Sequence, residues 1–320
     1  MADGADRPRV VYLGGLGRSG TTLLERLLGE LPGFCPVGEV VHLWQRGVAE
    51  GERCGCGEPV PECPFWRKVG EAGFGGWGEV DTRRIAELRR AVDRMRCIPQ
   101  LAAPALRSSF RRELTEYTGH YVRLYPAIRQ ISGCTAVVDS SKHPSLAFCL
   151  RWRTELDLRV VHMVRDSRAV AYSWTRRVGR PESVADPYML TYSPATAAWL
   201  WNLQNGALHL LAREGVPTLR VRYEDLVAAP AKTLSSIADF AGVPVSAGTL
   251  DFLGGDAAMR WADLGASHTA SGNPMRFTTG KIPIRPDDRW HTALPAAQRR
   301  TVTALTLPLL AAYGYARRPG

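Results

Sequence analysis

A glycine-rich segment near the N-terminus carries the strongest chemical signal in the sequence. Residues 14–22 read Gly-Gly-Leu-Gly-Arg-Ser-Gly-Thr-Thr, after an apolar run and before leucines at helical spacing. In such a strand–loop–helix unit, backbone N–H groups and the helix N-terminus cradle a phosphate. The glycines have the spacing of a nucleoside-triphosphate loop, but Thr21 stands where that loop has its lysine. We therefore predict a phosphate site in which Arg18 supplies the charge.

Charged residues also follow two other apolar runs. Residues 137–142 read Val-Val-Asp-Ser-Ser-Lys, and residues 161–165 read Val-His-Met-Val-Arg. Ligands of open parallel sheets bind beyond the carboxyl ends of the strands, so we expect Lys142 and Arg165 near the phosphate loop. A guanidinium offers a forked donor that suits phosphate. The alternative for Arg165 is a solvated side chain beside a helix that Asp166 or Ser167 caps.

The phosphate loop resembles that of a known family. Residues 17–24, Gly-Arg-Ser-Gly-Thr-Thr-Leu-Leu, resemble the 5′-phosphosulfate loop of sulfotransferases that use 3′-phosphoadenosine 5′-phosphosulfate (PAPS). The arginine at position 18 resembles the tyrosylprotein sulfotransferases and their bacterial relatives. The resemblance implies PAPS as co-substrate and 3′-phosphoadenosine 5′-phosphate as product. It also implies that Glu39, the acidic residue 21 positions after Arg18, is the catalytic base.

The same resemblance implies roles for residues further along the chain. Lys142 should contact the bridging oxygen or the sulfonyl group, and Arg165 with Ser173, eight residues later, should bind the 3′-phosphate. Residues 222–227 resemble the Tyr-Glu-Asp-Leu signature of the family, and the segment after residue 270 resembles a loop that closes over the nucleotide. The implied cofactor-binding residues are Gly17, Arg18, Ser19, Gly20, Thr21, Thr22, Arg165, Ser173, Arg177, Tyr223, Asn273, Arg276 and Arg285. The implied catalytic residues are Glu39, Arg18 and Lys142, with no metal required.

Asp139 keeps a second function open. An aspartate after an apolar strand can hold magnesium, so the alternative is a P-loop kinase or NTPase with a degenerate phosphate loop. The missing lysine at position 21 argues against this alternative. A kinase or NTPase would need magnesium for turnover, whereas a sulfotransferase should work in the presence of a chelator.

Strand and helix patterns alternate along the chain, which predicts an α/β fold. Buried strands are expected at residues 9–13, 135–138, 158–164 and 218–222. Helices are expected after residue 20, at 81–96, 108–130 and 191–213, and from Pro295 onward. We predict one domain over residues 1–320: a P-loop-type parallel sheet flanked by helices on both faces, with helical insertions. Residues 80–132 should form an insertion that covers the acceptor site, and residues 254–289 a long loop.

Composition restricts the class of protein and its partners. The 320 residues are 45% hydrophobic and 22% charged, which excludes disorder, collagen and coiled coil as descriptions of the whole chain. The net charge is +10, but arginine pairs are scattered and no nucleic-acid-binding module is present. No signal peptide and no apolar stretch of membrane-spanning length are found. We therefore expect a cytoplasmic enzyme with a small-molecule, lipid or carbohydrate acceptor, no nucleic-acid partner and no membrane span.

Three cysteines lie close together in the irregular segment 51–64. They are Cys54, Cys56 and Cys63. Zinc usually takes four ligands, so Cys35 or His42 would have to complete a metal site. Free thiols are the favoured interpretation, and a zinc site and a disulfide remain as alternatives.

Overall fold

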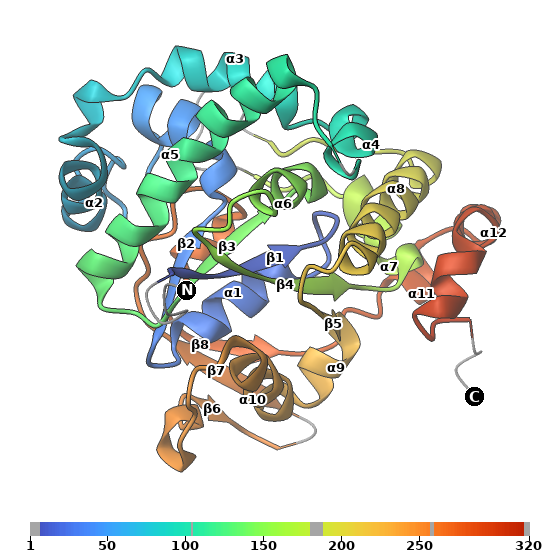
Figure 1. The fold of residues 1–320 in the computed structure, drawn as a ribbon. Coiled ribbons are helices and arrows are strands. Elements are labelled where there is room, and N and C mark those ends of the chain that lie inside the picture. The colour runs from blue at the N-terminus through green and yellow to red at the C-terminus, as the bar shows by residue number, and fades with distance from the viewer. Residues whose placement is uncertain (1–6, 104, 180–187, 257–258, 317–320) are drawn as a thin grey trace.

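Five parallel strands form the central sheet, in the order β2-β3-β1-β4-β5 (Figure 1). The computed structural model describes residues 7–103, 105–179, 188–256 and 259–316. The strands are β1 (Arg9–Gly14), β2 (Phe34–Gly38), β3 (Ala136–Lys142), β4 (Asp157–Val164) and β5 (Thr218–Arg222). The predicted α/β class with a parallel sheet is confirmed. The four expected strands are present, and the edge strand β2 is additional.

Helices cover both faces of this sheet, as predicted (Figure 1). The larger ones are α1 (Thr21–Gly29), α2 (Pro64–Phe74), α3 (Thr82–Val92), α5 (Ser108–Ser132), α7 (Ser167–Thr175), α8 (Pro194–Arg213), α10 (Pro230–Ala241) and α12 (Ala296–Ala312). The shorter ones are α4 (Ile98–Leu101), α6 (Pro144–Leu150), α9 (Tyr223–Ala228) and α11 (Trp290–Ala293). Pro295 lies just before α12 as its N-cap residue.

Alternate side chains of β1 enter two different cores, because successive residues of a strand point to opposite faces. Val11 and Leu13 pack with α1, α9 and α10. Val10 and Tyr12 pack with α5, α6 and α8. All four side chains are fully buried, and burial of each apolar side chain contributes about 1.5–3 kcal/mol. The strand is therefore held from both faces, and its carboxyl end is a rigid base for the phosphate loop.

The prediction of a long loop at residues 254–289 is wrong. It contains a three-stranded antiparallel sheet of β6 (Leu253–Gly254), β7 (Arg260–Leu264) and β8 (Gly280–Ile284). Ala262, Leu264, Ile282 and Ile284 are buried against the α1 side of the central sheet. Pro283 lies in β8, which pairs only with β7, and an edge strand tolerates proline. The strands are short and interrupted by Gly, Pro and Asp, so their pattern resembles a loop.

The predicted helical insertion comprises α3, α4 and α5. Helix α5 packs against α2 and α3, and touches β2 and β3 on the face that also carries α6. None of the described residues between 80 and 132 lines the main cavity described below. The role of this insertion as a cover for the acceptor site stays a prediction.

A buried carboxyl group ties α1 to two strands. Glu25 is 2% exposed; its Oε1 accepts a hydrogen bond from the Gly38 N–H at 2.6 Å, and its Oε2 accepts one from the Ser140 hydroxyl at 2.8 Å. Burial raises the pKa of Glu25 to about 7, against the opposing effect of these hydrogen bonds and of Lys142. The folded protein therefore keeps a proton on Glu25 at pH values at which the unfolded chain has lost it.

This raised pKa predicts a pH dependence of stability. Between about pH 4.5 and 7 the native state binds the proton more tightly, so this group's contribution to stability falls as the pH rises through that window. The variant Glu25→Gln, which has no proton to lose, should lack this decrease. Urea unfolding at a series of pH values measures it. Parallel pH profiles of the wild type and the variant would refute the assignment.

Candidate active site

The phosphate loop lies at the carboxyl end of β1, and its glycines are required by packing. Gly15 has φ 150°, and a Cβ there would lie 2.4 Å from the Met163 carbonyl oxygen of β4. Gly20 is the N-cap residue of α1 with φ 94°, and a Cβ there would lie 2.5 Å from the Tyr223 ring. Larger residues would force the loop away from β4 and from Tyr223 at the start of α9. The loop therefore packs tightly onto the sheet and opens toward the start of α1.

Arg18 and Lys142 share an unusual backbone conformation. With φ values of 74° and 70°, they are the only non-glycine residues with positive φ in the described part of the chain. This conformation is uncommon for side chains of their size, and such strained residues cluster at functional sites. Arg18 lies inside the phosphate loop and Lys142 at the end of β3. The strain thus marks the two cations that face the same cavity.

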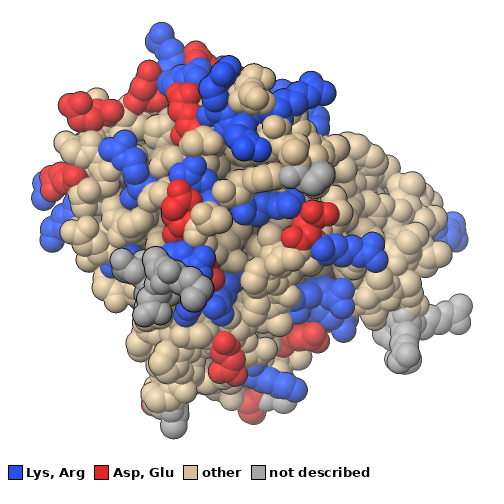
Figure 2. All heavy atoms as spheres, in the orientation of Figure 1, with Lys and Arg blue, Asp and Glu red and all other residues tan. Residues whose placement is uncertain are grey.

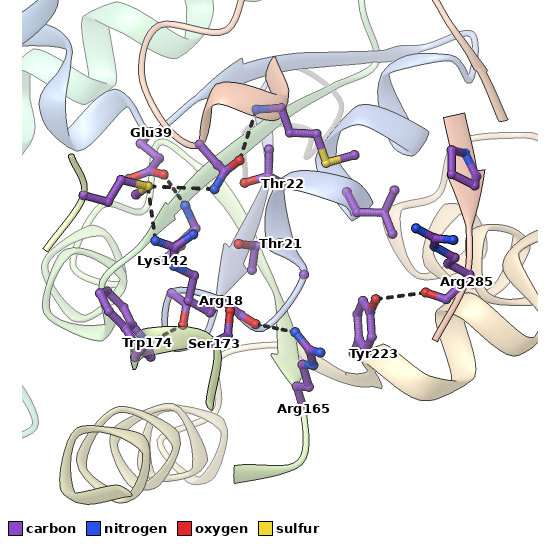
Figure 3. A pocket seen from close by; sticks show the side chains of 17 residues that line it. Arg18, Thr21, Thr22, Glu39, Lys142, Arg165, Ser173, Trp174, Tyr223 and Arg285 are labelled. Atoms are coloured by element: carbon purple, nitrogen blue, oxygen red, sulfur yellow. Dashed lines mark hydrogen bonds and ion pairs between the residues drawn. The ribbon is translucent and has the colours of Figure 1, made fainter. Parts of the chain in front are cut away.

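A cavity of about 330 Å³ opens beside the loop (Figure 3). Its walls bring together most of the residues that the sequence singles out. These are Gly17, Arg18, Gly20, Thr21, Thr22, Glu39, Lys142, Arg165, Ser173, Tyr223, Asn273 and Arg285. Leu23, Trp174, Met189, Met275 and Pro283 complete the lining. Residues from seven separate parts of the chain therefore converge on one site, with four cationic side chains among them.

Three predicted residues lie outside this cavity lining. Ser19 is buried within the loop, 1% exposed. Arg177 lies beyond the end of α7, not on it, and its exposed guanidinium stacks on the Tyr188 ring at 4.8 Å. Arg276 is 1% exposed and forms an ion pair with Glu52 at 2.9 Å. The structure therefore gives Arg276 a buried partner instead of a place in the cavity wall.

Glu39 and Lys142 form an ion pair at the inner end of the cavity (Figure 3). Glu39 follows β2 and Lys142 ends β3, so adjacent strands bring the two together. Burial acts to raise the pKa of Glu39, but the charge of Lys142, followed by that of His42, outweighs it and lowers the pKa to about 2. The Glu39 carboxyl is therefore ionised across the physiological pH range and able to accept a proton.

Arg18 lacks part of its hydrogen bonding. Its Nη2 contacts the Met189 sulfur at 3.3 Å, and its guanidinium lies 5.4 Å from the centre of the Trp174 ring. Its Nε is buried and has no hydrogen-bond partner among the described residues. Burial, then the nearby Arg176, lowers the pKa of Arg18. A buried donor without an acceptor is costly, and an anionic oxygen in the cavity would satisfy it.

Arg165 leaves the end of β4 and lies under the phosphate loop (Figure 3). Its Nη1 donates to the Arg18 carbonyl oxygen at 3.1 Å, and its guanidinium stacks over the Tyr223 ring at 4.4 Å. An ion pair with Asp287 at 3.3 Å holds the other end of the fork. Asp166 caps α7 through the Arg168 N–H, so capping and a cavity-facing Arg165 occur together.

Several residues of the site were not predicted from the sequence. Trp174 donates from Nε1 to the Gly17 carbonyl oxygen at 2.9 Å and so fixes the loop. Met189 lies in a segment that the sequence pattern leaves unassigned, and Pro283 lies in the segment expected to be a long loop. His42 lies 3.8 Å from the Glu39 carboxylate, and only its position three residues after Glu39 could have indicated this contact.

Asp139, the candidate magnesium ligand, has no free oxygen in the structure. Its Oδ1 accepts the Ser141 N–H at 2.8 Å, and its Oδ2 accepts the Tyr125 hydroxyl at 2.7 Å. It is fully buried and does not line the cavity. Its hydrogen bonds instead hold the turn that leads to Lys142, which gives Asp139 a structural role.

Fold and site together define an α/β protein with a phosphate loop and a cationic cavity at the carboxyl edge of a parallel sheet. The model of the sulfotransferase family matches residues 8–247, three quarters of the sequence. The chain therefore belongs to the sulfotransferase family, and sulfuryl transfer is its general activity. No curated protein matches the chain.

Two solved structures are similar to this chain. The sulfotransferase domain of the olefin synthase from Synechococcus PCC 7002 has 23% sequence identity and a TM-score of 0.51, with 97% of each chain covered. The sulfotransferase domain from the curacin biosynthetic pathway has 18% identity and a TM-score of 0.48, with 93% of this chain and 96% of that chain covered. The first match supports the fold.

Two surface properties complete the description. On the face drawn in Figure 2, Lys and Arg side chains are interspersed with Asp and Glu. Within the described residues, no helix is long and apolar enough to cross a membrane.

The ion pair predicts how Glu39 titrates when its partner is removed. In Lys142→Met the largest opposing charge is gone, so burial should dominate and raise the pKa of Glu39 well above its value of about 2. NMR titration of the carboxyl carbons, with Glu39→Gln to assign the signal, measures the change. An unchanged titration in the lysine variant would show that this charge does not control Glu39.

Proposed function

We propose that this chain transfers the sulfuryl group of PAPS to a hydroxyl or amine of a small-molecule, lipid or carbohydrate acceptor. The observation that carries the proposal is the convergence of Arg18, Lys142, Arg165 and Arg285 on one cavity beside the phosphate loop, with Glu39 among them. The nucleotide carries anionic groups at the 5′ and 3′ positions of its ribose, and the cations lie in separate parts of the cavity wall (Figure 3). Sulfotransferase family membership supports the chemistry.

In this mechanism the loop amides, Thr21, Thr22 and Arg18 bind the 5′-phosphosulfate. Arg165 and Ser173 bind the 3′-phosphate, and Tyr223, Asn273 and Arg285 line the nucleotide site. These donors are fixed before the substrate binds. Catalysis then comes mostly from positioning and from stabilisation of charge on the departing oxygen.

The reaction is an in-line displacement at sulfur, by analogy with phosphoryl transfer. The acceptor oxygen forms a bond to sulfur and gives its proton to Glu39. The bond between sulfur and the bridging oxygen breaks, and Arg18 and Lys142 stabilise the negative charge on the departing 3′-phosphoadenosine 5′-phosphate. Glu39 takes the proton, and the departing nucleotide keeps the electron pair of the broken bond.

The Glu39–Lys142 ion pair affects how strong a base Glu39 is in this mechanism. While Lys142 is bound to it, Glu39 is a weak base, because its pKa is held near 2. A sulfuryl group in the cavity would compete for the ammonium of Lys142. If the ammonium of Lys142 paired with the sulfuryl group instead, burial would raise the pKa of Glu39. Glu39 would then be a stronger base when the substrate is in place.

The base assignment predicts that Glu39→Gln loses turnover by a factor of about a hundred or more, since the amide cannot accept the proton. Binding of 3′-phosphoadenosine 5′-phosphate should persist. Single-turnover assays with labelled PAPS and calorimetry measure the two effects. Glu71→Gln, at an exposed glutamate of α2, is the matched control. Undiminished turnover in the Glu39 variant would refute the role of this residue.

The nucleotide site predicts that 3′-phosphoadenosine 5′-phosphate raises the melting temperature more than ATP, with or without magnesium. Arg165→Ala should weaken this binding by about tenfold or more, because it removes a charged phosphate contact. Arg300→Ala, which removes an exposed arginine, is the control for net charge. Stabilisation by ATP alone would contradict the proposal and favour the kinase or NTPase alternative. Unchanged affinity in Arg165→Ala would contradict the role of Arg165 in binding the 3′-phosphate.

A further inference from the structure

Three cysteines and one histidine lie together in a part of the fold that the sulfuryl-transfer site does not use. Cys54, Cys56 and Cys63 come from the segment between residue 51 and α2, and His268 comes from the connection between β7 and β8. Their ligand atoms all lie within 4.8 Å of one another. None of the four lines the main cavity. The fold therefore brings a histidine more than 200 positions away onto a cysteine-rich turn.

Three of the six separations within this cluster match the edges of a metal tetrahedron, and all six are 4.8 Å or less. The Cys63 sulfur lies 3.3 Å and the Cys54 sulfur 3.8 Å from Nδ1 of His268, and the sulfurs of Cys56 and Cys63 are 3.6 Å apart. Tetrahedral zinc with bonds of about 2.3 Å to sulfur and about 2.0 Å to nitrogen places its ligands roughly 3.3–3.8 Å apart. A disulfide would require about 2.05 Å between two sulfurs and would leave the histidine without a role.

Each of the three sulfurs accepts a hydrogen bond from a backbone N–H group. The N–H groups of Cys56, Glu58 and Trp66 donate to the sulfurs of Cys54, Cys56 and Cys63, respectively. Cys63 is also the N-cap residue of α2, where the helix dipole stabilises negative charge. Each sulfur therefore has a donor that suits a metal-bound thiolate.

The histidine is held in one orientation. The Phe65 ring stacks on the imidazole at 5.1 Å with an angle of 16° between the rings. The Trp66 Nε1 donates to the His268 carbonyl oxygen at 2.8 Å, and the Gly55 N–H donates to the Thr269 carbonyl oxygen at 2.9 Å. A Cβ at Gly55 would lie 2.7 Å from the Ser267 carbonyl oxygen, so the two segments touch through a glycine. Contacts within the protein therefore hold both sides of the cluster in place.

We propose that Cys54, Cys56, Cys63 and His268 bind one zinc ion. Three thiolates and a neutral imidazole form a complete tetrahedral set, so the ion has a structural role and offers no open position for a substrate. Binding displaces the protons of the thiols, and the bound complex carries one net negative charge. His268 takes the fourth position, and neither Cys35 nor His42 belongs to the cluster.

The ion would join two segments that support the active site. Beyond His268, the Ala270 N–H donates to the Val37 carbonyl oxygen at 2.9 Å, and the Ser271 carbonyl oxygen accepts the Glu39 N–H at 3.2 Å. On the other side, Glu52 accepts the Ser271 hydroxyl at 3.3 Å and pairs with Arg276. Zinc would therefore fix, from a distance, the strand end that carries Glu39.

Metal analysis of the full chain, expressed in zinc-supplemented medium without a polyhistidine tag, tests the proposal. We expect about one zinc per chain by mass spectrometry of the elements. Exchange for cobalt should give the intense visible bands of a tetrahedral thiolate site. Cys63→Ser should lose the metal, whereas Cys97→Ser, at a buried cysteine outside the cluster, should keep it. Metal-free wild-type protein that takes up neither ion would overturn the proposal.

Two further measurements keep the result decisive if Cys63→Ser does not fold. Release of zinc from the wild type with a mercurial reagent should lower the melting temperature, and added zinc after removal of the reagent should restore it. Mass spectrometry of the alkylated, unfolded chain shows whether the cysteines are thiols or a disulfide. A disulfide between any two of Cys54, Cys56 and Cys63 in the isolated protein would also overturn the proposal. None of these readouts depends on sulfuryl transfer.

Discussion

The ion pair between Glu39 and Lys142 requires the rest of the structure to hold two strand ends close together. A compensating charge stabilises the largely buried carboxylate of Glu39, and this compensation depends on adjacent strand ends. Asp139 holds the turn before Lys142 through both of its oxygens, and the Ser271 carbonyl holds the Glu39 backbone. The sheet edge therefore works as a scaffold that keeps one base and one cation together at a phosphate loop.

The sequence predicts the parts of this scaffold that are buried on both faces. β1, β3 and β4 are continuous apolar runs, because helices cover both faces, and the functional residues follow each run directly. The edge strands β2 and β8 contain Pro36 and Pro283, which an edge tolerates but which break the strand pattern. The prolines that an edge position permits therefore hide these two strands from the local sequence pattern.

The sequence predicts which cationic side chains line the cavity well at strand ends and poorly elsewhere. Arg18, Lys142 and Arg165 follow strands and reach the cavity, as expected. Arg276 and Arg177 have the same residue type but find Glu52 and Tyr188 as partners, and these contacts depend on long-range packing. The net charge of +10 is therefore only partly a property of the cavity. Long-range packing, more than the local motif, therefore determines whether a cation lines the cavity.

The contacts of residues 264–285 explain why their composition led to the wrong prediction of a loop. Three of its residues make separate contacts: His268 lies beside the cysteines, Ser271 bonds to the Glu39 backbone, and Asn273 lines the cavity. Such contacts need irregular backbone between short strands, since a regular strand would point alternate residues to fixed faces. A segment that joins a cysteine–histidine cluster to a base within six residues must therefore look loop-like in sequence while it is firmly packed in the fold.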